Sequence, residues 1–227
     1  MVAAVAVVAA VTERLTELEA FSRQVAGCTS CRLSEGRTQV VFGVGDPDAD
    51  LMFVGEAPGF HEDKQGYPFV GQAGKLLDKL LAGIGLLRDD VYIANTVKCR
   101  PPGNRDPQPD EKQACEPYLF RQIELIRPKV IATLGNHATK QLTGKETGIT
   151  RVHGQPQRLN VGALAVVLYP LYHPAAALYT PATFKVREED FARLPELLGA
   201  PVPEPASVVP LLAPPPAPEP TVQLGLF

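Results

Sequence analysis

The sequence has no strong excess of either charge and no apolar run long enough to cross a membrane. Its 22 basic and 25 acidic residues give a formal net charge of −3. The molecule as a whole therefore does not attract a polyanion, and any nucleic-acid contact must come from a local basic patch. The apolar run from Met1 to Val11 is too short to span a bilayer and lacks the basic leading region of a secretory signal. We expect a cytoplasmic protein whose residues 1–11 form an unstructured apolar leader.

Proline is plentiful in only one part of the chain. Many of the 23 prolines crowd together after Gly199, among few large side chains. Such a segment buries too little apolar surface to offset the entropy lost on ordering, so residues 200–222 are expected to form an extended, disordered linker. The preceding residues 12–199 have an ordinary globular composition and predict one catalytic domain, which we expect to be monomeric.

Apolar runs and helical patterns alternate along this domain. Alternation of this kind predicts an α/β fold with a mainly parallel sheet, which binds ligands beyond the carboxyl ends of its strands. We therefore expect the chemistry in the loops after Val54, Ala94 and Leu171. The strands are expected at Val40–Val44, Leu51–Val54, Val91–Thr96, Val130–Leu134 and Leu164–Leu168. The helices are expected at Thr12–Ala26, Ala73–Ile84, Asp110–Ile126, Ala138–Leu142 and Phe184–Leu198.

The four cysteines have an irregular spacing. Cys28 and Cys31 are separated by two residues, which suits two thiolates that share one metal centre, whereas Cys99 and Cys115 lie far apart in the sequence. An iron–sulfur cluster tolerates such spacing because the fold brings its ligands together. Spacing alone leaves zinc, disulfides and plain buried thiols as alternatives, with disulfides disfavoured in a cytosolic chain.

Four segments place polar or aromatic groups where a ligand can bind. Gly55-Glu56-Ala57-Pro58-Gly59 forms a sharp turn directly after a strand, and Phe69 lies in a glycine-rich approach to a helix. Asn95 ends a strand, where its carboxamide can offer both a donor and an acceptor. His173 precedes a proline at the end of another strand. Each has an ordinary structural alternative: a simple turn, a core aromatic residue, a cap or a loop histidine.

The ordered set of these motifs resembles the family-4 uracil-DNA glycosylases, which hold a [4Fe-4S] cluster. The similarity runs from Cys28 to about Leu178. It is carried by Cys28-x-x-Cys31, Gly55-Glu56-Ala57-Pro58-Gly59, Glu62-Asp63, Pro68-Phe69-Val70-Gly71, Asn95, Cys99, Cys115 and His173-Pro174. The resemblance implies a three-layer sandwich around a mainly parallel sheet. It also favours the cluster over zinc, with Cys28, Cys31, Cys99 and Cys115 as its ligands.

The chain departs from wider relatives in its first motif. Those enzymes carry Gln-Asp-Pro-Tyr, so their water-activating aspartate corresponds to Ala57 here, and Gly59 replaces the tyrosine that excludes thymine. The open position at Gly59 makes other bases, such as hypoxanthine or mismatched thymine, conceivable substrates. A subgroup that traps DNA covalently has a basic, histidine-containing insertion after the asparagine strand. Asn95 runs on to Cys99 without such an insertion, which favours turnover.

The resemblance implies a role for each motif in excising uracil from DNA. Asn95 would pair with uracil, Phe69 would stack on it, and His173 would hydrogen-bond O2. Glu56 is the first candidate to orient water or stabilise the sugar cation, and Glu62 is the second. The expected uracil-binding set is Glu56, Ala57, Pro58, Phe69, Val70, Asn95 and His173. Lys98, Arg100 and Arg105 are expected to contact phosphates, and Leu178 is a candidate wedge.

Two features bear on the protein's partners. The C-terminal Gln223-Leu224-Gly225-Leu226-Phe227 resembles the short peptides that dock bacterial repair proteins on the sliding clamp. A polar anchor followed by apolar side chains suits a hydrophobic groove. The main alternative to an enzyme is a non-catalytic DNA-binding or polymerase-associated module with the same fold and cluster. Its signature would be the loss of Asn95 or His173, and both are present.

Overall fold

The computed structural model describes residues 2–177 and 181–200. Its centre is a six-stranded sheet in the order β1-β3-β2-β4-β6-β5. The four inner strands are parallel, and the two edge strands run antiparallel to their neighbours. In chain order the strands are β1 (Val44–Gly45), β2 (Leu51–Gly55), β3 (Tyr92–Asn95), β4 (Val130–Leu134), β5 (Gln157–Val161) and β6 (Leu164–Leu171).

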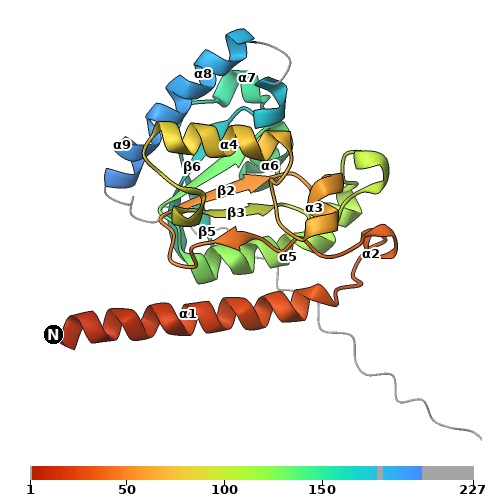
Figure 1. Ribbon diagram of the computed structural model, residues 1–227, viewed down its shortest axis with the longest axis horizontal. Coiled ribbons are helices and arrows are strands. Elements are labelled where there is room, and N and C mark those ends of the chain that lie inside the picture. Colours follow the sequence, from red (N-terminus) through yellow and green to blue (C-terminus); the bar gives the residue numbers. More distant parts are fainter. Residues whose placement is uncertain (1, 178–180, 201–227) are drawn as a thin grey trace, which may run out of the picture.

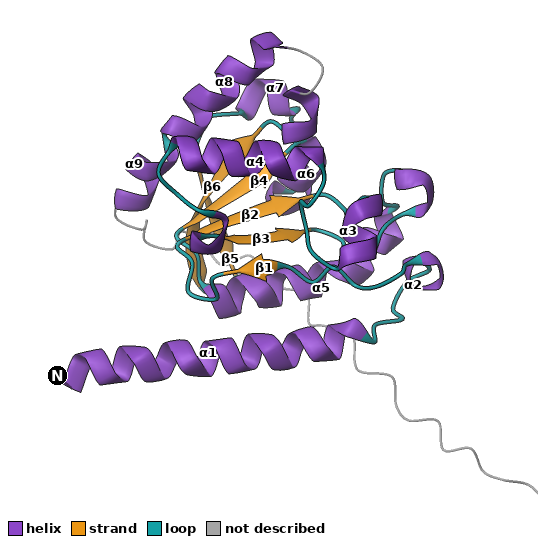
Figure 2. Cartoon of the chain, in the orientation of Figure 1, coloured by secondary structure: helices purple, strands orange, loops and turns teal. Residues whose placement is uncertain are grey.

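Helices cover both faces of this sheet (Figures 1 and 2). Alternate residues of β2 point to opposite faces, so Met52 and Val54 join one core while Leu51 and Phe53 join the other. The first core contains side chains of α1 (Val2–Ala26), α5 (Pro109–Ile126) and α6 (Asn136–Thr143). The second contains side chains of α4 (Gln72–Gly83), α8 (Pro181–Ala192) and α9 (Leu194–Gly199). The expected three-layer α/β sandwich is confirmed.

Short helical segments connect the layers. They are α2 (Leu33–Gly36), α3 (Phe60–Gln65), η1 (Arg88–Asp90), η2 (Pro102–Asn104), α7 (Ile149–Val152) and η3 (Pro174–Ala177). Within the described residues, we find no helix that is both long and apolar enough to cross a membrane. Leu178, most of the proline-rich segment and the C-terminal peptide lie outside the described residues.

Several elements differ from the sequence-based expectations. Residues 2–11 belong to α1 rather than to an unstructured leader, in keeping with the high helix propensity of alanine. The expected strand at Val40–Val44 is reduced to β1, because Gly43 and Gly45 adopt positive φ angles beside Tyr92. The long C-terminal helix is interrupted at Arg193, and Pro195 lies in the first turn of α9. Strand β5 was not predicted.

The strand register places four loops side by side. Gly55 pairs with Asn95 across β2 and β3, and Val54 pairs with Thr133 across β2 and β4. Leu134 in turn pairs with Leu171 across β4 and β6. The carboxyl ends of these four parallel strands therefore form one continuous rim, where ligands bind in sheets of this kind.

Candidate active site and cysteine centre

The amide of Asn95 is buried at this rim with an unsatisfied acceptor. Its residue is 2% exposed, and Oδ1 has no hydrogen-bond partner within the described residues. A Cβ atom on Gly55 would lie 2.4 Å from this oxygen and 2.7 Å from Cζ of Phe69. Glycine at position 55 therefore allows the amide and the ring to approach the end of β2. A buried acceptor without a partner is costly, which marks a place for a donor on a ligand.

Phe69 is held in an uncommon backbone conformation. Its φ angle is 53°, in the left-handed region, and its ring is buried. The ring stacks with the imidazole of His173, with centroids 5.8 Å apart and an interplanar angle of 29°. A Cβ atom on Gly74 would lie 1.7 Å from the Phe69 carbonyl oxygen, so the loop needs glycine there.

Glu62 ties the Phe69 loop to the turn after β2. Its Oε1 accepts hydrogen bonds from the backbone N–H groups of Val70 at 3.0 Å and Gly71 at 3.1 Å. Its Oε2 accepts one from the N–H of Gly59 at 3.1 Å. Both carboxylate oxygens are thus occupied by backbone amides. A strained φ angle persists only where surrounding contacts fix it, and Glu62 supplies such contacts.

His173 presents a defined ring nitrogen to the site. Its Nδ1 accepts a hydrogen bond from the N–H of Ala175 at 3.1 Å, so in the neutral ring Nε2 carries the hydrogen. Burial lowers the pKa of His173 to about 4, with a further lowering by the charge of Arg187 and a partial offset by Glu62. The imidazole is therefore a neutral donor over the ordinary pH range.

Glu56 begins a chain of three side chains that the sequence did not predict. Its Oε1 is buried and lies 3.4 Å from Nδ1 of His137, whose Nε2 lies 3.5 Å from Oδ2 of Asp106. Burial raises the pKa of Glu56, His137 lowers it, and Asp106 raises it. The backbone of Glu56 is fixed because its carbonyl accepts hydrogen bonds from the hydroxyl of Thr96 at 2.8 Å and from the N–H of Val97 at 3.1 Å. Ala57 and Pro58 continue this turn, half-buried and buried respectively.

No motif in the sequence singles out His137. It lies in the first turn of α6, which follows β4 directly. The signal that would have found it is the strand-to-helix junction at Gly135, whose φ of 94° turns the chain sharply. The order of the sheet places this junction next to Glu56, and that order is not visible in the local sequence.

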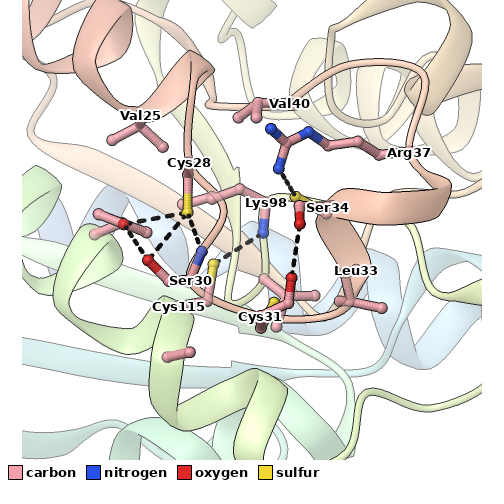
Figure 3. Close-up of a pocket in the computed structure, with 14 residues that line it drawn as sticks. Val25, Cys28, Ser30, Cys31, Leu33, Ser34, Arg37, Val40, Lys98 and Cys115 are labelled. Carbon is pink, nitrogen blue, oxygen red and sulfur yellow. Dashed lines mark hydrogen bonds between the residues drawn. The ribbon is translucent and has the colours of Figure 1, made fainter. Parts of the chain in front are cut away.

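The four cysteines line one cavity, and Figure 3 labels Cys28, Cys31 and Cys115 around it. Cys28 and Cys31 come from the segment after α1, Cys99 from the segment after β3, and Cys115 from α5. All four are free thiols, and Cys99 and Cys115 are buried. Among the described residues, the groups of three or more potential metal ligands within 4.8 Å of one another include no cysteines. Tetrahedral zinc, with Zn–S bonds of about 2.3 Å, would hold its sulfurs roughly 3.8 Å apart. Three cysteines in that arrangement would lie within the 4.8 Å separation.

The thiols are surrounded by hydrogen-bond donors. The guanidinium of Arg37 donates to Sγ of Cys99 at 3.3 Å, and the backbone N–H of Lys98 donates to Sγ of Cys115 at 3.2 Å. Burial raises the pKa of Cys115 to about 12 and also raises the pKa values of Cys31 and Cys99. For Cys28, burial also acts to raise the pKa, but hydrogen bonds with Ser30 and Tyr118 outweigh it and lower the pKa. A metal centre would stabilise these thiolates, which burial alone disfavours.

The three expected phosphate contacts have different positions. The expectation for Lys98 was wrong: this side chain is buried, and its Nζ donates to the carbonyl of Asn95 at 2.8 Å and to Oε1 of Gln122. Arg105 forms a bidentate ion pair with buried Glu111, at 2.8 and 2.6 Å. Arg100 is partly exposed, bonds Oδ1 of Asn104 and lies over the ring of Phe60 at 5.1 Å.

Comparison with known proteins agrees with this architecture. The sequence model of the uracil DNA glycosylase superfamily matches residues 42–194. The type-4 uracil-DNA glycosylase of Sulfurisphaera tokodaii is 50% identical over 192 residues, covering 82% of this chain and 87% of that protein. Those of Saccharolobus solfataricus and Archaeoglobus fulgidus are 48% and 46% identical, over 82% of this chain and 88% and 95% of theirs. The chain belongs to the type-4 uracil-DNA glycosylases.

Proposed function

We propose that this protein hydrolyses the N-glycosidic bond of uracil in DNA and leaves an abasic site, which starts base-excision repair. The proposal rests on one observation: Asn95, Phe69 and His173 lie close together at one rim of the sheet. It provides a buried amide with a free acceptor, a stacking ring and a neutral donor. Uracil inside a duplex is out of reach, so the nucleotide must first be extruded, at a cost of a few kcal/mol.

Asn95 selects the base in this proposal. Its Oδ1 accepts from uracil N3–H while its amide nitrogen donates to uracil O4. Cytosine reverses both groups, since it offers an amine in place of O4 and an acceptor at N3. Cytosine bound at Asn95 would leave a buried polar group unpaired, which costs about 1–3 kcal/mol. Phe69 provides the surface on which the base stacks, with Val70, Ala57 and Pro58 around it.

His173 and Glu56 stabilise the two charges that develop during cleavage. As the bond breaks, its electron pair moves to uracil N1, and the Nε2–H of His173 donates to uracil O2. Backbone amides of the turn near Ala57 act as further donors. Glu56 faces the sugar cation and orients the attacking water. We assign this role to Glu56 rather than to Glu62 because backbone amides occupy both oxygens of Glu62.

Cys28, Cys31, Cys99 and Cys115 are proposed to hold a [4Fe-4S] cluster. The shared cavity, the N–H donors to sulfur and a spacing too wide for zinc support this assignment. A cluster would supply a rigid crosslink between the segment after α1, the segment after β3 and α5. The base-recognition residues are not among its ligands, so we propose a structural role for it.

Contacts beyond the base are also proposed. Of the three residues expected to contact phosphates, Arg100 is the best placed, because Lys98 is buried and Arg105 is paired with Glu111. We further propose that Gln223–Phe227 docks on the sliding clamp, at the end of a tether formed by residues 200–222, and that the protein acts as a cytoplasmic monomer. Deleting residues 223–227 should abolish retention by immobilised clamp and leave excision from free oligonucleotides unchanged. Equal retention of the truncated and full-length proteins would refute the clamp proposal.

The activity is tested with labelled oligonucleotides that carry uracil in a single strand, opposite adenine or opposite guanine. After incubation with the purified protein, alkali cleaves the strand at abasic sites. We expect scission at uracil and none in matched oligonucleotides that carry cytosine. Binding to uracil DNA without scission of any of the three substrates would favour the non-catalytic module.

A further inference from the structure

The geometry points to His137 as a positioning residue that holds the Glu56 carboxylate toward the sugar, with Asp106 fixing the far side of the imidazole. This inference rests on the proposed role of Glu56 and adds a residue to which no motif of the sequence drew attention. The residues in contact come from three elements: Glu56 follows β2, His137 lies at the start of α6, and Asp106 follows η2. The two contacts measure 3.4 and 3.5 Å, and they involve different nitrogens of one ring.

The burial of Glu56 gives His137 its importance. Oε1 of Glu56 is shielded from water and has no hydrogen-bond partner in the described part of the chain. Burial raises the pKa of Glu56, and His137, at 3.4 Å, is the neighbour that opposes this most strongly. Three groups act on its pKa besides burial: His137 lowers it, Asp106 raises it, and Lys112 of α5 lowers it. A carboxylate that faces a developing sugar cation must be ionised and aligned to be effective.

Asp106 explains why the ring keeps this orientation. Its side chain is 72% exposed and lies on the solvent side of His137, whereas Glu56 is on the inner side. A histidine between two carboxylates has both ring nitrogens directed by partners, which restricts rotation of the ring. The imidazole therefore links the inner carboxylate to the surface of the protein.

The two amide substitutions of His137 distinguish positioning from packing. Asparagine places its amide nitrogen near the site of Nδ1 and keeps a polar group beside Glu56, whereas glutamine places its amide near Nε2. Single-turnover excision should therefore rank wild type above His137→Asn, with His137→Gln and His137→Ala slower still. We expect His137→Ala to slow excision on the order of 10-fold to 100-fold, the range for losing one polar contact to a charged group. A packing role would instead favour glutamine, the larger amide.

The pH profile gives an independent readout. Removing His137 removes an influence that lowers the pKa of Glu56, so the acid limb of the rate profile should move to higher pH in His137→Ala. Lys140→Ala is the matched control, because it removes an α6 side chain that pairs with Glu146, away from this chain of contacts. It should leave both the rate and the acid limb unchanged. An unshifted limb in His137→Ala would overturn the inference.

Two further measurements distinguish a failure of this inference from a failure of the proposed role of Glu56. If His137 acts through Glu56, His137→Ala should slow excision far less in a Glu56→Gln background than in the wild type; equal slowing in both would overturn it. Excision by Glu56→Gln at the wild-type rate would instead remove the proposed role of Glu56 itself. Activity should also survive EDTA, since inhibition by the chelator would mean that Glu56, His137 and Asp106 hold a cation.

Discussion

The Nζ atom of Lys98 donates a hydrogen bond to the backbone carbonyl of Asn95 at 2.8 Å, while the backbone N–H of the same lysine bonds Sγ of Cys115 at 3.2 Å. One buried residue thus connects the backbone of Asn95, which is proposed to recognise the base, to Cys115. Gln122 of α5 accepts a second bond from Lys98 and donates to the carbonyl of Phe42. A substitution at Cys115 should therefore disturb the position of Asn95 through Lys98.

The first prediction concerns the metal centre. Purified protein should be brown, with broad absorption near roughly 400 nm. Cys115→Ser should lose iron and lower the melting temperature on the order of 10 °C, because the crosslink between β3 and α5 is lost. Ser30→Ala is the control: it alters the same cavity without removing a thiol and should keep its iron. Colourless protein with stoichiometric zinc would contradict the assignment.

The second prediction concerns His173. Replacing it with alanine should lower the single-turnover rate by about 10²–10³, the range for the loss of one donor to a developing anion. Binding of uracil DNA, measured separately, should persist. Loss of binding in parallel with the rate would indicate a damaged fold rather than a missing donor.

Because the pKa of His173 is lowered in the folded protein, the free energy of unfolding should depend on pH. Titration of the ring itself can be followed by NMR. Its folded-state pKa of about 4 lies below the ordinary histidine value of about 6.5. Between these values the unfolded chain binds more protons, so stability rises with pH through this window and is complete above it. The rise of stability with pH in this window should be smaller in His173→Gln than in wild type. A ring that titrates near 6.5 in the folded protein would refute the neutral donor.

The third prediction concerns Glu62. Its substitution by alanine leaves the N–H groups of Gly59, Val70 and Gly71 without their acceptor. We expect a loss of about 2–3 kcal/mol in the free energy of unfolding and slower excision, because Phe69 is no longer held in its strained conformation. Denaturant unfolding and single-turnover kinetics measure the two effects. Full stability together with slow excision would point to a direct chemical role for Glu62.

The fourth prediction separates the two arginines near η2. Arg100→Ala should weaken binding of all DNA sequences to a similar degree and reduce the slope of log affinity against log salt by about 1. Arg105→Ala should leave that slope unchanged. It should lower the free energy of unfolding, because the buried carboxylate of Glu111 loses its ion-pair partner. Identical slopes for wild type and Arg100→Ala would exclude a phosphate contact at Arg100.

Much of the fold was predictable because buried parallel strands read as apolar runs. The runs at Leu51 and Val130 are strands of the central sheet, and Asn95 and His173 lie at the carboxyl ends of β3 and β6. Strand β5 escaped prediction because it is an edge strand with polar residues such as Arg158 and Asn160, and is only partly buried. Its pairing with β6, rather than its own pattern, makes it a strand.

The candidate site was predictable where motifs carried the information. Lys98 was misread because basic residues are usually exposed, and only the structure shows Gln122 and the Asn95 carbonyl accepting from it. His137 was missed because its meaning depends on β4 lying beside β2, a long-range relation. Sequence patterns thus located side chains at strand ends, while the order of the strands decided which of them meet.

The most direct test is the single-turnover rate of wild type and Asn95→Asp on paired oligonucleotides that carry uracil or cytosine at one position. Both members of each pair are placed opposite an abasic analogue, so that base pairing does not differ between them. We predict rapid excision of uracil and none of cytosine by wild type. In Asn95→Asp, uracil excision should fall by about 10-fold or more, because an ionised carboxylate repels uracil O4, and the preference for uracil over cytosine should shrink. Unchanged uracil excision and unchanged discrimination in Asn95→Asp would contradict the account.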